Sequence, residues 1–244
     1  MMNDKAWITA TIAHEATGAV PYNVMLAPPA IARMCAHYGA ASAKALPEVL
    51  GLPMRFISPH SPKPLYADPD VFGPTVTDEF GVVWSTNYID RGAPLVYALP
   101  EANLTGYTFP DPADPTRFAG IAAWCAEHTA HYTVLMAGAL WERATFMRSM
   151  EDLLLDVALN REFVEDLLDH LLAHILRTME IAATLGPFDC YGLSDDYGTQ
   201  KSLLMSPATW RELIKPRLQQ IIALANRQGR QTFLHSCGCV EAVV

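Results

Sequence analysis

A histidine and a cysteine two residues apart, His235 and Cys237, directly follow an apolar run of β-forming residues at 232–234. If the strand continues through them, both side chains share one face and their Cα atoms lie about 6.6 Å apart. One metal ion could then bind both, because Zn–N and Zn–S bonds are about 2.0 and 2.3 Å long. Imidazole and thiolate suit zinc far better than magnesium or calcium. The alternative interpretation is a packed histidine beside a buried thiol that behaves as a small hydrophobic group.

Acidic residues follow two other predicted strands. Asp195 and Asp196 come just after an apolar run at 190–193, and Glu142 follows the buried run at 132–138. Strands that alternate with helices predict parallel βαβ units, whose sites form at the carboxyl ends of the strands. We therefore expect Asp195, Asp196, His235 and Cys237 to line one mouth.

Each carboxylate allows a functional and a structural interpretation. Asp195 and Asp196 could orient His235, position a substrate or supply a general acid. Alternatively, one of them only caps the turn around Gly198. Glu142 is a further catalytic candidate, and its alternative is a solvated helix start. The histidines at 128, 131, 170 and 174 lie on or beside predicted helices and are expected to face solvent.

Composition limits the class of protein. The 244 residues are 51% hydrophobic and 18% charged, which is typical of a folded globular chain, and that length matches one α/β barrel. The sequence contains no run of 18 or more apolar residues, so no membrane span is expected, and no secretory signal is visible. Five cysteines without an export signal indicate reduced thiols or metal ligands in the cytoplasm. A net charge of −9 without a basic stripe argues against nucleic acid as a partner.

Periodicity and capping residues predict the order of elements. Extended segments are expected at 20–26, 54–57, 75–77, 82–84, 132–138, 190–193 and from 231. Helices are expected at 28–38, 42–50, 115–130, 151–159, 161–185 and 207–228, the last of them kinked at Pro216. Five prolines predict a loop over 59–74, so that 59–115 decorates the main fold with loops and a hairpin.

Three segments carry a resemblance to a known family: residues 192–200 (Gly-Leu-Ser-Asp-Asp-Tyr-Gly-Thr-Gln), residues 204–212 (Leu-Met-Ser-Pro-Ala-Thr-Trp-Arg-Glu) and residues 234–238 (Leu-His-Ser-Cys-Gly). Together with 141–156 they resemble the uroporphyrinogen decarboxylase superfamily, and most closely its zinc-dependent, corrinoid-linked methyltransferase branch. The resemblance is specific over about 132–240. It implies a single domain over 1–244 that folds as a distorted (β/α)8 TIM-type barrel.

In that branch, the histidine and cysteine of the H-x-C motif bind zinc, which corresponds to His235 and Cys237 here. A second cysteine, far downstream, completes the protein ligands of the family, and this chain ends at Val244. About six of eight strand–helix units are recognisable, so we expect an incomplete barrel in a partial chain. Cys239 is the nearby substitute if the chain is complete.

The implied activity is methyl transfer between a corrinoid protein and a small-molecule thiol activated on zinc. Decarboxylation of a porphyrinogen is the alternative within the superfamily. It is disfavoured because the glycine–arginine signature near the N-terminus is absent and the chain is acidic. A non-catalytic paralogue that binds a corrinoid or a partner protein is a third possibility. The missing third ligand favours it, whereas the retained H-x-C motif argues against it.

Overall fold

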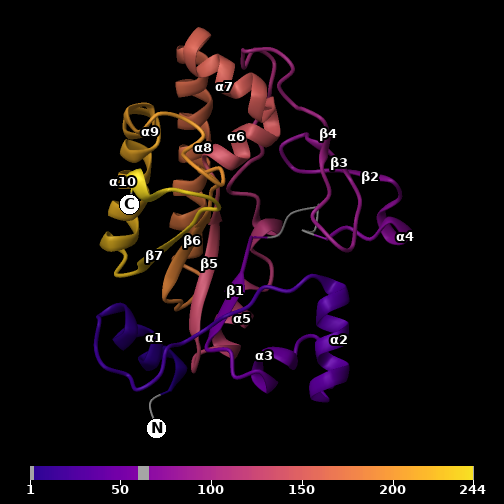
Figure 1. The fold of residues 1–244 in the computed structure, drawn as a ribbon, viewed down its shortest axis with the longest axis vertical. Helices are drawn as coiled ribbons and strands as arrows, with labels where there is room; N and C mark the ends of the chain where they lie inside the picture. Colours follow the sequence, from indigo (N-terminus) through magenta and orange to yellow (C-terminus); the bar gives the residue numbers. More distant parts are fainter. Residues whose placement is uncertain (1–2, 60–65, 244) are drawn as a thin grey trace.

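The computed structural model describes residues 3–59 and 66–243, and its central feature is a parallel sheet (Figure 1). The strands are β1 (Met54–Ile57), β5 (Tyr132–Gly138), β6 (Cys190–Ser194) and β7 (Gln231–His235). They pair in the order β1-β5-β6-β7, so each strand lies beside the next parallel strand along the chain and the order never reverses. Because all the pairs are parallel, the four carboxyl ends lie at one edge of the sheet.

The α/β class with a parallel sheet confirms the coarse expectation from the sequence. Within the described residues, four strands form an open sheet, fewer than the six strand–helix units expected. Closure into a (β/α)8 barrel therefore stays a prediction.

Helices cover the two faces of this sheet unequally. The helices are α1 (Asp4–Ile12), α2 (Pro28–Tyr38), α3 (Leu46–Val49), α4 (Pro69–Phe72), α5 (Ile121–Glu127), α6 (Trp141–Arg148), α7 (Met150–Leu159), α8 (Arg161–Ala182), α9 (Pro207–Leu213) and α10 (Lys215–Arg227), with 3-10 turns η1 (Pro115–Phe118) and η2 (Glu241–Val243). The large core joins α8 and α10 to one face, through residues such as Leu135, Leu168 and Ile221. On the other face, Ile8 of α1 packs with Tyr132 and Val134 in a much smaller cluster.

A second, antiparallel sheet lies beside the main one and contains β2 (Thr75–Thr77), β3 (Val83–Ser85) and β4 (Pro94–Val96). The β2–β3 hairpin was predicted from the sequence, whereas β4 was missed. Arg143 of α6 holds this sheet to the main body, because its Nη1 donates to Asp78 Oδ2 at 2.7 Å. Asp78 also accepts from the backbone of the hairpin turn and from the Trp84 indole.

Capping residues explain several helix ends. The Ser206 hydroxyl accepts from the Thr209 N–H at the start of α9, as the Ser-Pro pair predicted. The helix expected over 207–228 is divided at Ile214 into α9 and α10, next to Pro216, where the kink was predicted. Likewise, the helix expected over 115–130 is divided into η1 and α5 by Gly120 in the left-handed conformation.

Three expectations were wrong or fall partly outside the described residues. The segment 20–26 forms no strand, and Val20 and Met25 are 85% and 82% exposed. β-propensity acts mainly through packing against neighbouring strands, and this segment has none. His174, expected at the surface, is only 7% exposed. The loop predicted over 59–74 contains the short helix α4, and its residues 60–65 lie outside the described part of the chain.

Candidate metal centre

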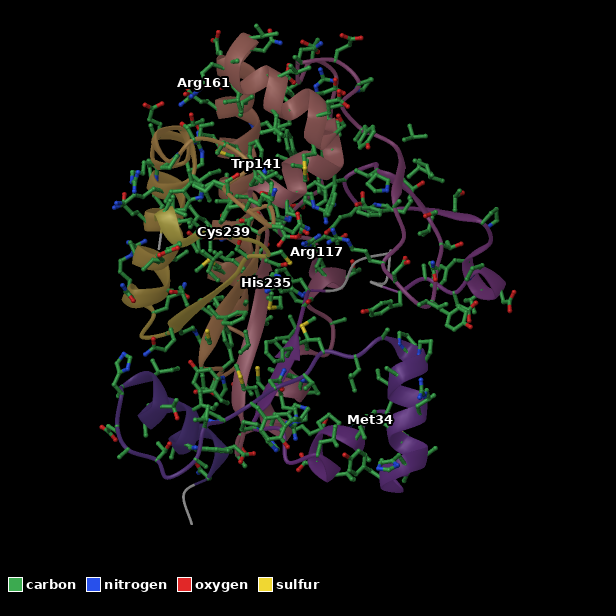
Figure 2. The ribbon with its side chains drawn as sticks, in the orientation of Figure 1. Met34, Arg117, Trp141, Arg161, His235 and Cys239 are labelled. Carbon is green, nitrogen blue, oxygen red and sulfur yellow. The ribbon has the colours of Figure 1, made fainter. Side chains whose placement is uncertain are left out.

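The ends of β6 and β7 hold the residues that the sequence singled out. Ser194 pairs with His235 in the parallel ladder, and the Asp195 N–H extends the pairing by donating to the His235 carbonyl at 3.0 Å. Asp196 and Cys237 therefore each lie two residues beyond this pair, just past the ends of two adjacent strands. Figure 2 shows His235 near the middle of the molecule, at the end of the parallel sheet.

Three potential ligand atoms converge at this edge. The Cys237 Sγ lies 3.4 Å from His235 Nε2, and Asp196 Oδ1 lies 3.6 Å from the same nitrogen. One ligand atom from each of the three residues lies within 4.8 Å of the other two. His235 and Cys237 are exposed and Asp196 is half-buried, so the cluster opens to solvent.

This arrangement fits zinc. Two ligands with zinc bonds of 2.0 and 2.3 Å in tetrahedral geometry are about 3.5 Å apart, close to the separations observed here. Nitrogen, sulfur and one carboxylate oxygen also form a donor set that zinc accepts readily. With these three residues as ligands, a zinc ion would have room to bind one further molecule.

The charges around the thiol bear on its protonation. Asp196 raises the pKa of Cys237 through hydrogen bonding, and burial and the negative charges of Asp196 and Glu142 raise it further, whereas Arg91 lowers it. The Cys237 N–H also donates to Asp196 Oδ1 at 2.8 Å, which holds the carboxylate beside the cysteine. A thiol with a raised pKa stays protonated at neutral pH unless a cation displaces the proton.

Asp195 does not face the opening. It is fully buried, and its carboxylate accepts from the Leu140 N–H at 3.0 Å, the Glu142 N–H at 2.8 Å and the Tyr197 hydroxyl at 2.9 Å. Burial raises the pKa of Asp195 to about 7, although these three hydrogen bonds act in the opposite direction. The structure thus places Asp195 beneath the cluster, in contact with the start of α6.

Glu142 lies in the first turn of α6 and is only 9% exposed. Its Oε1 accepts from Arg91 Nη1 at 2.7 Å, and the Arg91 guanidinium lies 4.7 Å from the centroid of the Phe146 ring. Glu142 and Arg91 both act electrostatically on Cys237. The loop between β3 and β4 therefore contributes the positive charge of Arg91 near the candidate metal site.

Two glycines bring the loops after β6 and β7 into close backbone contact. A Cβ on Gly238 would lie 2.4 Å from the Gly198 carbonyl oxygen, and one on Gly198 would lie 2.7 Å from the Cys239 nitrogen. The Cys239 N–H donates to the Thr199 carbonyl at 2.8 Å across this contact. Only glycine fits at this crossing.

Cys239 does not belong to the metal cluster of the described residues. It lines a separate cavity of about 750 Å³ together with residues at the start of α9, such as Met205 and Pro207. In Figure 2, Cys239 lies next to His235, on the side toward α9. Asp196 is therefore the third group near His235 and Cys237 that could bind a metal ion.

Sequence reasoning missed the residues that support the cluster. Tyr197 is buried, donates its hydroxyl to Asp195, and donates its N–H to the Ser236 hydroxyl at 3.0 Å. Its position in the sequence, directly after Asp195 and Asp196, is the signal that could have identified Tyr197 as part of the site. Arg91 has no such signal, because it lies about fifty residues from Glu142 in a separate sheet.

Comparison with solved structures finds a methyltransferase from Methanosarcina mazei. The two folds superpose with a TM-score of 0.64, covering 100% of this chain and 72% of that chain, at 19% sequence identity. At this identity the similarity shows the fold alone. No protein-family model and no curated protein sequence matches the chain. In the described part of the chain, none of the helices is both long and apolar enough to cross a membrane.

Proposed function

We propose that this chain is a zinc-dependent methyltransferase that moves a methyl group between a corrinoid protein and a small thiol. The observation that carries the proposal is the convergence of Asp196, His235 and Cys237 within 4.8 Å at the carboxyl edge of a parallel sheet. The similarity of the fold to a methyltransferase from Methanosarcina mazei supports it.

The three residues of the cluster would hold the metal. Asp196 takes the place of the second cysteine that the family resemblance implies, because Cys239 lies apart. A zinc ion held by these residues would leave a position for a substrate thiol and would favour the deprotonated form of that thiol near neutral pH.

The protein's own groups would manage the proton and the position of the substrate. Glu142 lies within electrostatic range of the cluster, and its pairing with Arg91 fixes the carboxylate. We assign Glu142 as the acceptor of the thiol proton. The sulfur–methyl bond then forms as the bond between the methyl group and its donor breaks, and that electron pair remains with the donor.

The resemblance also implies that the sheet belongs to a TIM-type barrel of the uroporphyrinogen decarboxylase superfamily. The unreversed strand order supports this, because strands in such a barrel follow one another in sequence order around the sheet.

Methyl transfer from free methylcobalamin to 2-mercaptoethanol tests the proposal, with the thioether measured by mass spectrometry. Replacing a ligand should remove the metal that activates the thiol. His235→Ala and Cys237→Ser are therefore expected to slow the reaction about 100-fold or more.

Cys239→Ser is the matched control, since it changes a neighbouring exposed cysteine outside the cluster. Its rate should stay within about twofold of wild type. Wild-type rates in both ligand variants would show that the metal assignment is wrong. Release of CO2 from a porphyrinogen without any methyl transfer would favour the decarboxylase instead.

A further inference from the structure

We infer that Asp195 is a positioning residue that joins the helix carrying Glu142 to the strand carrying the metal ligands. The inference rests on the proposed function for the identity of the metal site. The contacts from which it is argued are all between groups of the protein. Asp195 has no exposed surface, so it cannot reach a substrate in the open cluster. Its contacts indicate a different role from that of Asp196.

The side chain of Asp195 caps α6 from a distant part of the chain. Leu140, at the N-cap of α6, has a side chain that cannot accept a hydrogen bond, so the first N–H groups of this helix lack a local partner. The Asp195 carboxylate accepts from two of them, those of Leu140 and Glu142. A capping bond of this kind fixes the start of the helix, and with it the backbone from which the Glu142 side chain extends.

The backbone of Asp195 holds the other half of the site. Its N–H donates to the carbonyl of His235 at 3.0 Å, one residue beyond the last pair of the β6–β7 ladder. The next residue, Asp196, accepts from the Cys237 N–H. Consecutive residues therefore contact both members of the H-x-C motif.

Tyr197 completes the connection. Its hydroxyl donates to Asp195, and its N–H donates to the hydroxyl of Ser236, the residue between the two metal ligands. The Tyr197 ring is buried and packs edge-on against Trp210 of α9, which keeps it in place. Displacement of Asp195 should therefore alter α6 and the H-x-C motif together.

Asp195→Asn tests this coupling, because asparagine has nearly the same size but only one acceptor oxygen. Its amide group would face an N–H donor at the start of α6 or the Tyr197 hydroxyl. Asp156→Asn is the matched control. Asp156 is also buried, but its carboxylate accepts from Arg148 at the end of α6 and from Asn160 at the end of α7, away from the start of α6.

Two readouts separate positioning from simple stabilisation. In the metal-free protein, Asp195→Asn should speed amide hydrogen exchange both at 140–142 and at 235–237. Asp156→Asn should speed it only around α7 and the end of α6. In zinc competition with a chelator, Asp195→Asn should weaken binding about tenfold, and Asp156→Asn should leave it unchanged at a temperature where both remain folded.

Faster exchange confined to 140–142, with unchanged zinc affinity, would overturn the inference and leave Asp195 as a helix cap only. If the wild-type protein bound no zinc, the proposed function would fail, and the exchange experiment would still decide the coupling. In that case, faster exchange at both segments supports the inference, and exchange changed at one segment alone contradicts it.

Discussion

At the scale of single residues, adjacent aspartates have different environments. Asp195 is buried beneath the cluster and bonds only to protein groups, whereas Asp196 is half-buried beside His235 and Cys237. Successive residues in extended backbone point in opposite directions, so one carboxylate turns inward and the next turns to the open edge. The same residue type thus supplies a structural anchor and a candidate metal ligand in consecutive positions.

His174 gives a prediction about pH and stability. Burial lowers the pKa of His174 from 6.5 to about 4, and the nearby Arg117 lowers it as well. Between these two values the unfolded chain binds a proton that the native protein does not, so the free energy of unfolding should fall as the pH drops from 6.5 to 4. The full effect of this one group is about 3 kcal/mol.

Chemical denaturation at pH 7.0, 5.5 and 4.5 measures this slope. His174→Gln, which keeps a hydrogen-bonding group near Arg117, should show a shallower dependence on pH than wild type. His170→Gln is the control on the same helix, because His170 lies at the surface. An unchanged slope in His174→Gln would contradict the assignment.

At the scale of elements, the site depends on the crossing of the loops after β6 and β7. Gly238 has a φ of +79°, and a Cβ there would collide with the backbone of Gly198. Gly229 has a similar φ of +67° but nothing within 4 Å of the corresponding Cβ position. An alanine would therefore suffer similar backbone strain at Gly229 and at Gly238. Only at Gly238 would its Cβ also collide with a neighbouring segment.

Gly229→Ala is expected to cost about 1 kcal/mol of stability through backbone strain alone. Gly238→Ala should cost about 1–3 kcal/mol more, because the loops must move apart. It should also weaken zinc binding, since Cys237 is the preceding residue. Equal losses of stability for the two variants, measured by denaturant unfolding, would show that the crossing is not tightly packed.

The sequence predicted the parallel elements well and the peripheral ones poorly. The run at 132–138 coincides with β5, and the pattern from 231 leads into β7, because buried strands and capped helices leave strong local signals. By contrast, residues 20–26 resemble a strand but form none. Whether such a run becomes a strand depends on a neighbouring strand, which the local sequence does not specify.

The site was predictable in part for the same reason. His235, Cys237 and the aspartate pair follow strands, and parallel pairing brings strand ends together. The different directions of Asp195 and Asp196, and the pairing of Arg91 with Glu142, depend on contacts between distant segments. No local pattern encodes these contacts.

At the scale of the whole molecule, the carboxyl edge of the sheet gathers groups from separate parts of the chain. Glu142 follows β5, Asp196 follows β6, and His235 ends β7. Arg91 reaches the same region from the three-stranded sheet, which Arg143 and Asp78 hold against α6. Both sheets therefore contribute to one candidate site, so both must fold to assemble it.

The zinc content of the purified protein tests the central claim most directly. Elemental analysis of wild type, Cys237→Ser and Cys239→Ser should give about one zinc ion per chain for wild type and Cys239→Ser. Cys237→Ser should have lost most of it, because the cluster would keep only His235 and Asp196. Absence of zinc from wild type after reconstitution, or equal zinc in all three proteins, would contradict a metal centre at these residues.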